Sequence, residues 1–328
     1  MKHISIIIIL LSFAGQSYGQ FLRADHKKAA QLKHRPLIVA LFDMEEEAGT
    51  YCDSIHMAWY NDNIRDLFLQ HWTLSDSIIF MRSKRVASYI AAKSSDYVIF
   101  SAGPSREGQQ SSGDIFWFPS FTFMLYLSED GKKFDSRMVD RGLYSEPLVP
   151  DMEMTGQLFR GKYIYKLSMA DLSISENDIV FVINNFTISI NKALREKKSK
   201  GGIYAPKIPR EVTTRLKNMT LLVPDGLDPG GTDEKKVAKY YKHKFRISSQ
   251  EEISKAILSN KENTAYLHYL WSDHERMFQG LIIDAGTQEV LAVFRPGAIS
   301  IRSEKCPPTG TSYRSRISMN VKRLRSLK

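Results

Sequence analysis

The fold is first indicated by the stretch Pro36-Leu37-Ile38-Val39-Ala40-Leu41-Phe42, an uninterrupted apolar run. A short run of this kind predicts a strand that is buried on both faces. The residues that follow it, from about 52 to 72, place Tyr60, Ile64 and Leu67 at helical spacing on one stripe. A buried strand followed by an amphipathic helix therefore opens the folded part of the chain.

The chain then continues to alternate between short apolar runs and helical spacing. We expect three further strands in this first copy, over 78–81, 97–100 and 121–127, the last of which returns as 134–139. Ser83 is expected to cap a helix between the first two of these strands. A polar, Gly-rich loop is expected over 102–114.

A later part of the chain follows the same order. It opens with the strand Met219-Thr220-Leu221-Leu222-Val223, and the later strands are expected over 244–247, 265–270, 281–283 and 290–294. A helix is expected over 233–242. A second helix begins at one of two capping boxes, Ser248-x-x-Glu251 or Ser249-x-x-Glu252. The last two strands form a hairpin that turns at Asp284-Ala285-Gly286, where the glycine is expected to supply a positive φ.

The two copies also agree in their spacing. Met81 before the first capped helix parallels residues 246–247 before the second. The same four-residue step joins Val86 to Ile90 and Ile253 to Ile257. Any α/β chain alternates between strands and helices, but the closing hairpin that both copies share favours an internal duplication.

These patterns predict an α/β fold made of two three-layer α/β modules, each β-α-β-α-β plus a hairpin, related by internal duplication and joined by a helical segment. The joining segment contains a long helix that begins at Ser173-x-x-Glu176. Ile179, Ile183, Phe186 and Ile190 mark one face of that helix. Alternation at Phe186, Ile188 and Ile190 leaves a strand as the lesser alternative.

This order of elements resembles the small α/β modules of bacterial envelope proteins, such as the N-terminal domain of the TolB type and the CsgG-like family. The opening Leu221-Leu222-Val223-Pro224, with its helix and the 245–257 block, is similar to exported proteins of the Bacteroidota. The resemblance covers most of the chain in topology but contains no specific motif. It implies an envelope location and a role in binding or assembly, and it supplies no catalytic residue.

The N-terminus predicts export. Lys2, the apolar run 4–14 and the small residues around Ser17 and Gly19 form the three regions of a cleavable signal peptide, with cleavage before Gln20. The alternatives are an uncleaved anchor and a buried first strand. The first cysteine is Cys52, so none lies at the cleavage site to carry a lipid. We therefore expect a periplasmic or secreted protein with no membrane span after cleavage.

The chain is accordingly divided into five parts. These are a signal peptide (1–19), a first α/β module (20–140), a helical bridge (141–205), a second α/β module (206–296) and a basic C-terminal tail (297–328).

The net charge of +10 is concentrated at the C-terminus. From Arg295 onward nine cations face a single acid, Glu304, and among the cations are Arg316, Lys322, Arg323 and Arg325. Such a tail favours an anionic envelope partner, namely a lipid head group, lipopolysaccharide or glycan, and another envelope protein is the other partner considered. Export argues against nucleic acid. A solvated tail, with 317–321 adding an edge strand, is the alternative.

The ends of the first strands of the two copies carry acidic residues. Asp43 follows the first strand, and Asp225 and Asp228 follow its counterpart. Ligands of open α/β sheets bind at such strand ends, and carboxylates there suit a hard cation. Helix capping is the simpler interpretation. Phosphate-loop and dinucleotide fingerprints are absent, so the sequence predicts no cofactor.

Four other candidates each have a simpler alternative. His268, Asp273 and His274 are candidate zinc ligands, although a polar turn explains them more simply. Cys52 and His56 stand four residues apart on one helix as a candidate nucleophile and base, against a chance pairing.

Trp117, after the polar loop, is a candidate contact for a glycan or peptide, against a place in a core strand. An oxidising compartment would permit a disulfide between Cys52 and Cys306, and two unpaired thiols are the alternative. Taken together, the residues favour an exported binding or assembly protein without catalysis. The alternative is a hydrolase or metal-dependent enzyme that uses an acidic or Cys/His cluster at a strand end.

Overall fold

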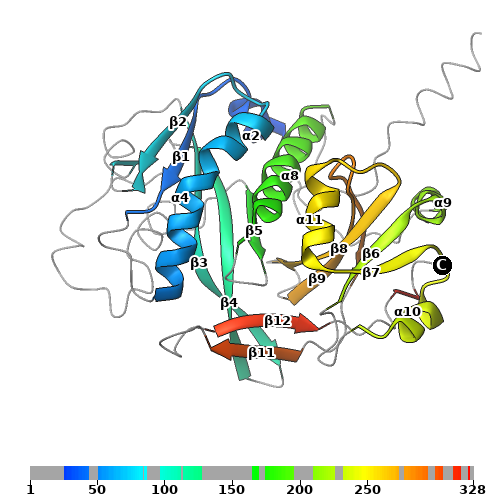
Figure 1. The fold of residues 1–328 in the computed structure, drawn as a ribbon. Coiled ribbons are helices and arrows are strands. Elements are labelled where there is room, and N and C mark those ends of the chain that lie inside the picture. The colour runs from blue at the N-terminus through cyan, green and yellow to red at the C-terminus, as the bar shows by residue number, and fades with distance from the viewer. Residues whose placement is uncertain are drawn as a thin grey trace, which may run out of the picture.

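The computed structural model describes most of the chain between His26 and Arg325. The described residues are 26–43, 51–83, 85–86, 97–111, 114–127, 165–169, 174–195, 210–225, 232–272, 277–294, 300–305, 313–318 and 324–325. They confirm an α/β fold, in which helices pack on both faces of a mixed sheet (Figure 1).

The first half of the sheet contains strands β1 to β5. Their bounds are Leu37–Leu41, Ile78–Arg82, Val98–Ser111, Asp114–Leu127 and Tyr165–Met169, and their spatial order is β2-β1-β3-β4-β5. The pairs that β1 forms with β2 and β3 are parallel, and the pairs β3–β4 and β4–β5 are antiparallel. Helix α2 (His26–Leu32) precedes β1, and helix α4 (Tyr51–His71) connects β1 to β2.

The second half repeats this arrangement. Its strands β6 to β10 are Thr220–Pro224, Phe245–Ser248, Thr264–Ser272, Met277–Asp284 and Val290–Phe294. Their order is β7-β6-β8-β9-β10, again with two parallel and then two antiparallel pairs. Helix α9 (Arg210–Asn218) precedes β6, α10 (Glu234–Tyr240) precedes β7, and α11 (Gln250–Leu258) precedes β8.

The register of the strands shows a closer similarity between the two halves than the order of elements shows by itself. Leu37 of β1 pairs with Ile78 and Val98, and Leu221 of β6 pairs with Phe245 and Ala265. The second and third strands of each half are therefore separated by the same 20 residues along the chain. An equal spacing without insertion or deletion is what an internal duplication would produce, and a common origin of the halves remains our proposal.

This register corrects one expected equivalence. If Ile78 and Val98 are aligned with Phe245 and Ala265, which have the same 20-residue separation, the residue that corresponds to Met81 is Ser248 rather than one of residues 246–247. With that correction the buried residues Val86 and Ile253 fall at equivalent positions, five residues after Met81 and Ser248.

The two halves share one sheet and one core. The beginning of β8 pairs with β6, and its end pairs with β5 through Ser168–Trp271 and Met169–Leu270. Helix α8 (Glu176–Arg195) lies at this junction, against α2 and α4 on one side and α11 on the other (Figure 1). The largest hydrophobic cluster accordingly runs from α4 through α8 to the sheet of the second half.

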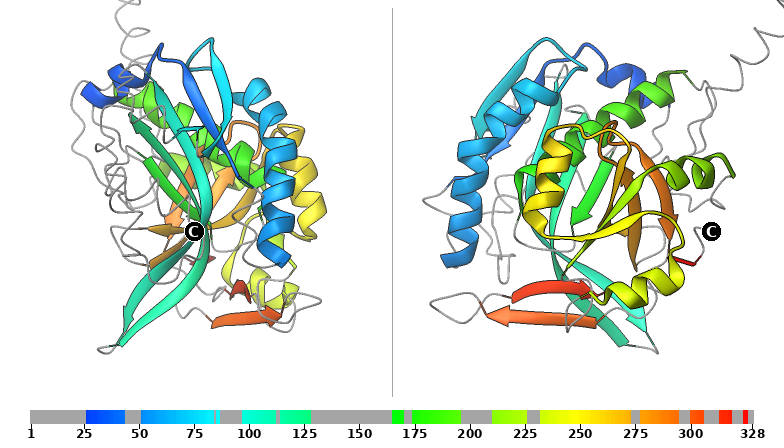
Figure 2. Two further views of the ribbon diagram at one scale, coloured as in Figure 1. Left: turned by 90° about the vertical axis from the view of Figure 1, so that its left-hand side faces the viewer. Right: turned by 45° about the vertical axis from the view of Figure 1, so that its right-hand side comes forward.

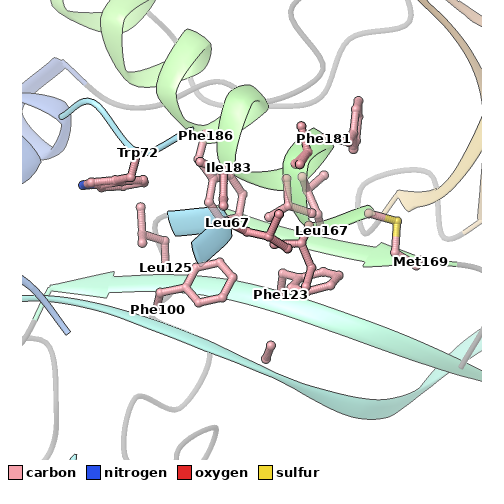
Figure 3. Packing of buried hydrophobic residues seen from close by; sticks show 14 of the residues in the cluster. Leu67, Trp72, Phe100, Phe123, Leu125, Leu167, Met169, Phe181, Ile183 and Phe186 are labelled. Atoms are coloured by element: carbon pink, nitrogen blue, oxygen red, sulfur yellow. The ribbon is translucent and has the colours of Figure 1, made fainter. Parts of the chain in front are cut away.

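Helix α8 is buried along most of its length. Eleven of its 20 residues are buried, including the consecutive Val180, Phe181, Val182 and Ile183, which is typical of a helix enclosed by protein on several sides. The ring of Phe186 packs edge-on against Phe100 of β3 at 6.3 Å (Figure 3). Each fully buried side chain of this size contributes about 1.5–3 kcal/mol to folding.

Several expectations differ from the structure. Within the polar stretch 102–114, residues 102–111 do not form a loop but continue β3, which pairs with β4 as far as Ser111–Asp114. The bridge over 141–205 contains strand β5 as well as the expected helix. The helix start is set by Ser175 and Asp178 rather than by Ser173 and Glu176. The predicted return strand 134–139 lies outside the described residues.

Part of the basic tail is folded. Strands β11 (Ser300–Lys305) and β12 (Tyr313–Ser318) form a separate antiparallel hairpin, which we call the basic hairpin. Of the expected edge-strand residues 317–321, 317 and 318 belong to β12, and 319–321 lie outside the described residues. Leu324 is fully buried in the core cluster of the second half. The chain beyond the hairpin is therefore anchored to the body of the protein.

We expect Phe186→Ala to lower the free energy of unfolding by about 3–5 kcal/mol, because its buried ring fills the core that both halves share. The control is Leu69→Ala on the exposed side of α4, where the side chain is 61% exposed and the expected loss is below about 0.5 kcal/mol. Urea denaturation followed by circular dichroism measures both. Equal losses would contradict a central role for α8.

Candidate functional site

At the end of β1, polar side chains form hydrogen bonds with the backbone of the last residue of the strand and of the residue after it. The Asn61 side chain of α4 accepts from the Phe42 amide at 2.8 Å and donates to the Phe42 carbonyl at 3.0 Å. Arg82 donates to the same carbonyl, and Ser83 donates to the Leu41 carbonyl at 2.9 Å. These polar side chains satisfy the backbone as it leaves the sheet, just before Asp43. Their role in this geometry is therefore to satisfy the backbone hydrogen bonds at the end of the strand.

The end of β6 is closed by different contacts. The Thr232 amide donates to the Asp225 carbonyl at 2.7 Å, and its hydroxyl donates to the Pro224 carbonyl at 2.6 Å. By the sheet register Asp225 corresponds to Leu41, two residues before Asp43, so the two acids are not equivalent positions. Asp228, the third predicted acid, lies outside the described residues.

In the described part of the chain, the main group of candidate functional side chains surrounds His268 on β8. Its Nε2 atom lies 3.2 Å from Met169 Sδ of β5 and 3.7 Å from Asp178 Oδ1 of α8. The ring of Phe181, one turn along α8, packs against the imidazole with the ring centres 5.1 Å apart. Three elements from both halves of the protein thus converge on one imidazole. We call His268, Met169 and Asp178 the junction cluster.

The carboxylate of Asp178 is held in place by the start of its own helix. Its Oδ2 atom accepts from the Ser175 amide at 2.8 Å and from the Ser175 hydroxyl at 2.7 Å. This is the reciprocal arrangement of a capping box, with aspartate in the place of glutamate. The other oxygen, Oδ1, is directed toward His268.

The imidazole of His268 is mostly enclosed, and its side chain is 21% exposed. Burial lowers the pKa of His268 below its usual value, and the nearby Asp178 carboxylate opposes that change. Burial is the larger influence, so the neutral ring is favoured near neutral pH. A neutral imidazole has one nitrogen lone pair that can bind a proton or a metal.

A row of buried polar side chains, Tyr266, Gln288 and Asn185, continues from this cluster along α8, and we call it the polar seam. The Tyr266 hydroxyl donates to Gln288 Oε1 at 2.9 Å, and the Gln288 amide donates to the Ala285 carbonyl at 2.7 Å. Asn185 of α8 donates to the Gln288 carbonyl at 3.4 Å. Gln288, not Gly286, has the positive φ of this turn, at 57°. Its side-chain bonds hold it in that conformation.

A second buried amide on this side of the sheet has no such partner. Gln279 of β9 is fully buried, and neither its Nε2 nor its Oε1 has a hydrogen-bond partner among the described residues. It pairs with Leu270, which in turn pairs with Met169, so the three residues form one row across β9, β8 and β5. A buried amide without partners costs about 1–3 kcal/mol, which marks this row as unusual.

The predicted zinc group is only partly visible. Asp273 and His274 lie outside the described residues, whereas His268 is in contact with Met169 and Asp178, which were not predicted. Across the ranges given above, no group of three or more His, Cys, Asp or Glu side chains is arranged to hold a metal. The capping-box spacing of Ser175 and Asp178 could have identified Asp178 from the sequence, whereas no local pattern distinguished Met169.

Other predicted residues are placed by backbone only or not at all. Cys52 and His56 belong to α4, but their side chains are outside the description, as is Cys306, so the disulfide and the Cys/His pair remain predictions. Trp117 lies in β4 opposite Gly108 rather than after a loop. Lys322 and Arg323 are also outside the described residues, while Arg325 is exposed beside the buried Leu324.

The basic hairpin lies against the long β3–β4 ribbon. β12 is in contact with β4 (Figure 1), and the left view of Figure 2 shows the far end of the ribbon pointing away from the hairpin. In its register Arg302 stands directly opposite Arg316, and Glu304 stands opposite Arg314. The predicted Arg316 therefore belongs to a pair of facing arginines.

Comparison with protein-family models, with curated proteins and with solved structures finds no match to this chain. The resemblance to envelope modules of the TolB and CsgG types therefore remains an expectation. In the described part of the chain, no helix is both long and apolar enough to cross a membrane.

The polar seam predicts opposite outcomes for two buried tyrosines. Tyr266→Phe removes a donor and leaves Gln288 Oε1 without its partner, so we expect the free energy of unfolding to fall by about 1–3 kcal/mol. Tyr241→Phe is the control, because the Tyr241 hydroxyl is buried and makes no hydrogen bond. It should cause no loss at neutral pH. Urea denaturation compares the two, and equal losses would argue against the seam.

Tyr241 also predicts a pH dependence. Burial raises the pKa of Tyr241 to about 12, whereas an unfolded tyrosine titrates near pH 10. The folded state therefore disfavours the phenolate, and stability is lost as the pH rises from about 10 to 12. Tyr241→Phe should lose less stability than the parent protein across that interval, as measured by urea denaturation at each pH. If both proteins lost the same stability over that pH interval, Tyr241 would not be the source of the alkaline destabilisation.

Proposed function

We propose that this chain is an exported binding protein of the cell envelope that holds phosphate-bearing lipid head groups on its basic hairpin. The expected signal peptide supports the location, and the hairpin supports the ligand. The observation that carries the proposal is the register of β11 and β12, which sets two arginines directly opposite each other. Catalysis is no part of this proposal.

Facing arginines are unfavourable without a counter-charge. Residues directly opposite in an antiparallel pair have Cβ atoms about 4.5–5.5 Å apart, and like charges at that spacing destabilise the pair. Arg302 and Arg316 occupy such a position in a hairpin with strands of only six residues. A bound anion between them would replace repulsion by two attractions, and guanidinium groups bind phosphate through paired hydrogen bonds.

The basic hairpin is attached to the body of the protein, which favours a fixed binding surface over a loose tail. The chain enters the hairpin from β10, whose five residues are all buried, and passes from it to the buried Leu324. β12 also contacts β4. Attachment on these sides limits the entropy that the hairpin would lose when it binds. The exposed Arg325 adds a cation close to the anchor.

Lipid head groups are the anions that fit this location. An exported chain meets the envelope surface, where each basic residue near an anionic membrane contributes about 1 kcal/mol. The double substitution Arg302→Gln/Arg316→Gln should therefore weaken binding by about 10- to 30-fold. Co-sedimentation with vesicles of phosphatidylcholine mixed with phosphatidylglycerol measures this change. Vesicles of phosphatidylcholine alone should bind neither protein.

The matched control is Lys33→Gln/Lys217→Gln, which removes the same charge from exposed positions on the α2 and α9 sides of the protein. It should leave vesicle binding close to that of the parent. If the two double variants bind equally, the hairpin is not the surface. Competition by inorganic phosphate at low concentration would instead point to a site for free phosphate, and binding to neutral vesicles would remove the electrostatic basis of the proposal.

A further inference from the structure

The junction cluster brings together three side chains whose contacts are weak as hydrogen bonds. The thioether of Met169 is a poor acceptor, and its sulfur lies 3.2 Å from His268 Nε2. The Asp178 oxygen at 3.7 Å from the same nitrogen is beyond hydrogen-bond range. A nitrogen, a sulfur and an oxygen donor therefore gather without a strong bond among them.

The two distances from His268 Nε2, one to the sulfur and one to the oxygen, match those between donors that share one metal ion. Two atoms bound to an ion at about 2.0–2.3 Å lie roughly 3.2–3.7 Å apart when the angle between the bonds is about 95–125°. The nitrogen–sulfur distance of 3.2 Å and the nitrogen–oxygen distance of 3.7 Å fall at the two ends of that range.

We propose that His268 Nε2, Met169 Sδ and Asp178 Oδ1 form a binding site for a copper ion, taken up as Cu(I). The donor set selects the metal: thioether ligands favour Cu(I), and imidazole also suits copper. Calcium and magnesium prefer oxygen ligands alone, and zinc sites are built from nitrogen, oxygen and thiolate rather than thioether. The proposal is independent of the lipid site on the basic hairpin.

The surroundings of the cluster hold the donors in place. Ser175 binds Asp178 Oδ2 through its amide and hydroxyl, which leaves Oδ1 available to an ion. Supporting hydrogen bonds of this kind orient metal ligands and tune them. Met169 is 3% exposed and is fixed by the pairing of β5 with β8.

Gln279 provides a second, independent observation. Its buried amide has no partner, and it stands on the same face of the sheet as His268, because His268 pairs with Leu281 two residues away. Diagonal neighbours in a sheet are about 7–8 Å apart at Cα, within reach of a long side chain. An amide oxygen is a known weak ligand of copper sites. An ion at the cluster would give this buried group a partner.

Binding would also link the two halves of the protein. Met169 and Asp178 precede the second half in sequence, whereas His268 lies within it. An ion that binds only the folded state raises its stability by mass action. The midpoint of thermal unfolding should therefore rise when Cu(I) is added.

The direct test uses tag-free protein titrated with Cu(I) under anaerobic conditions, in competition with the chelator bicinchoninate. We expect one Cu(I) per chain. Met169→Leu, close in volume to the parent residue, should weaken Cu(I) binding at least about tenfold and remove the sulfur neighbour from the X-ray absorption spectrum of the bound copper. Any weak binding of Zn²⁺ should be unchanged by this substitution.

The matched control is Met124→Leu, which replaces another buried methionine on the opposite face of the sheet and should leave Cu(I) binding unchanged. His268→Gln and Asp178→Asn should also weaken binding, with circular dichroism to establish that each variant is folded. The proposal is overturned if folded Met169→Leu binds Cu(I) as the parent does, or if the folded parent binds none.

Discussion

The burial of α8 is the interaction on which the rest of the structure depends. This helix packs against α2 and α4 of the first half and against α11 of the second, and eleven of its residues are buried. Neither half could cover that helix alone, because its apolar surface is not confined to one stripe. The two repeated halves therefore form one core, and each supplies a face of its sheet to the same helix.

Polar contacts then set how the second half sits against α8. Asp178 is directed at His268, and Asn185 is bonded to Gln288 on the β9–β10 turn. Apolar packing tolerates small shifts between a helix and a sheet, whereas the hydrogen bond from Asn185 to Gln288 requires a particular relative position. The seam that positions the halves also places Met169 beside His268, so the arrangement that specifies the fold creates the junction cluster.

Local patterns predicted the secondary structure where one choice was clearly best. The apolar run before Asp43 is strand β1, and the capping box of Ser249 and Glu252 begins α11 with both hydrogen bonds present. The loop prediction was wrong over 102–111, because glycine and polar residues favour a loop unless a neighbouring strand supplies partners for the backbone groups. β4 supplies those partners along its whole length.

Most of the strands and helices, the similar order of elements in the two halves and the basic C-terminus could be predicted from the residues, because each depends on composition or on the spacing of a few positions along the chain. The junction cluster could not. Met169 and His268 are 99 residues apart, and they meet only because the end of β8 pairs with β5. That pairing depends on α8 being buried between the halves, a long-range packing choice that no local pattern encodes.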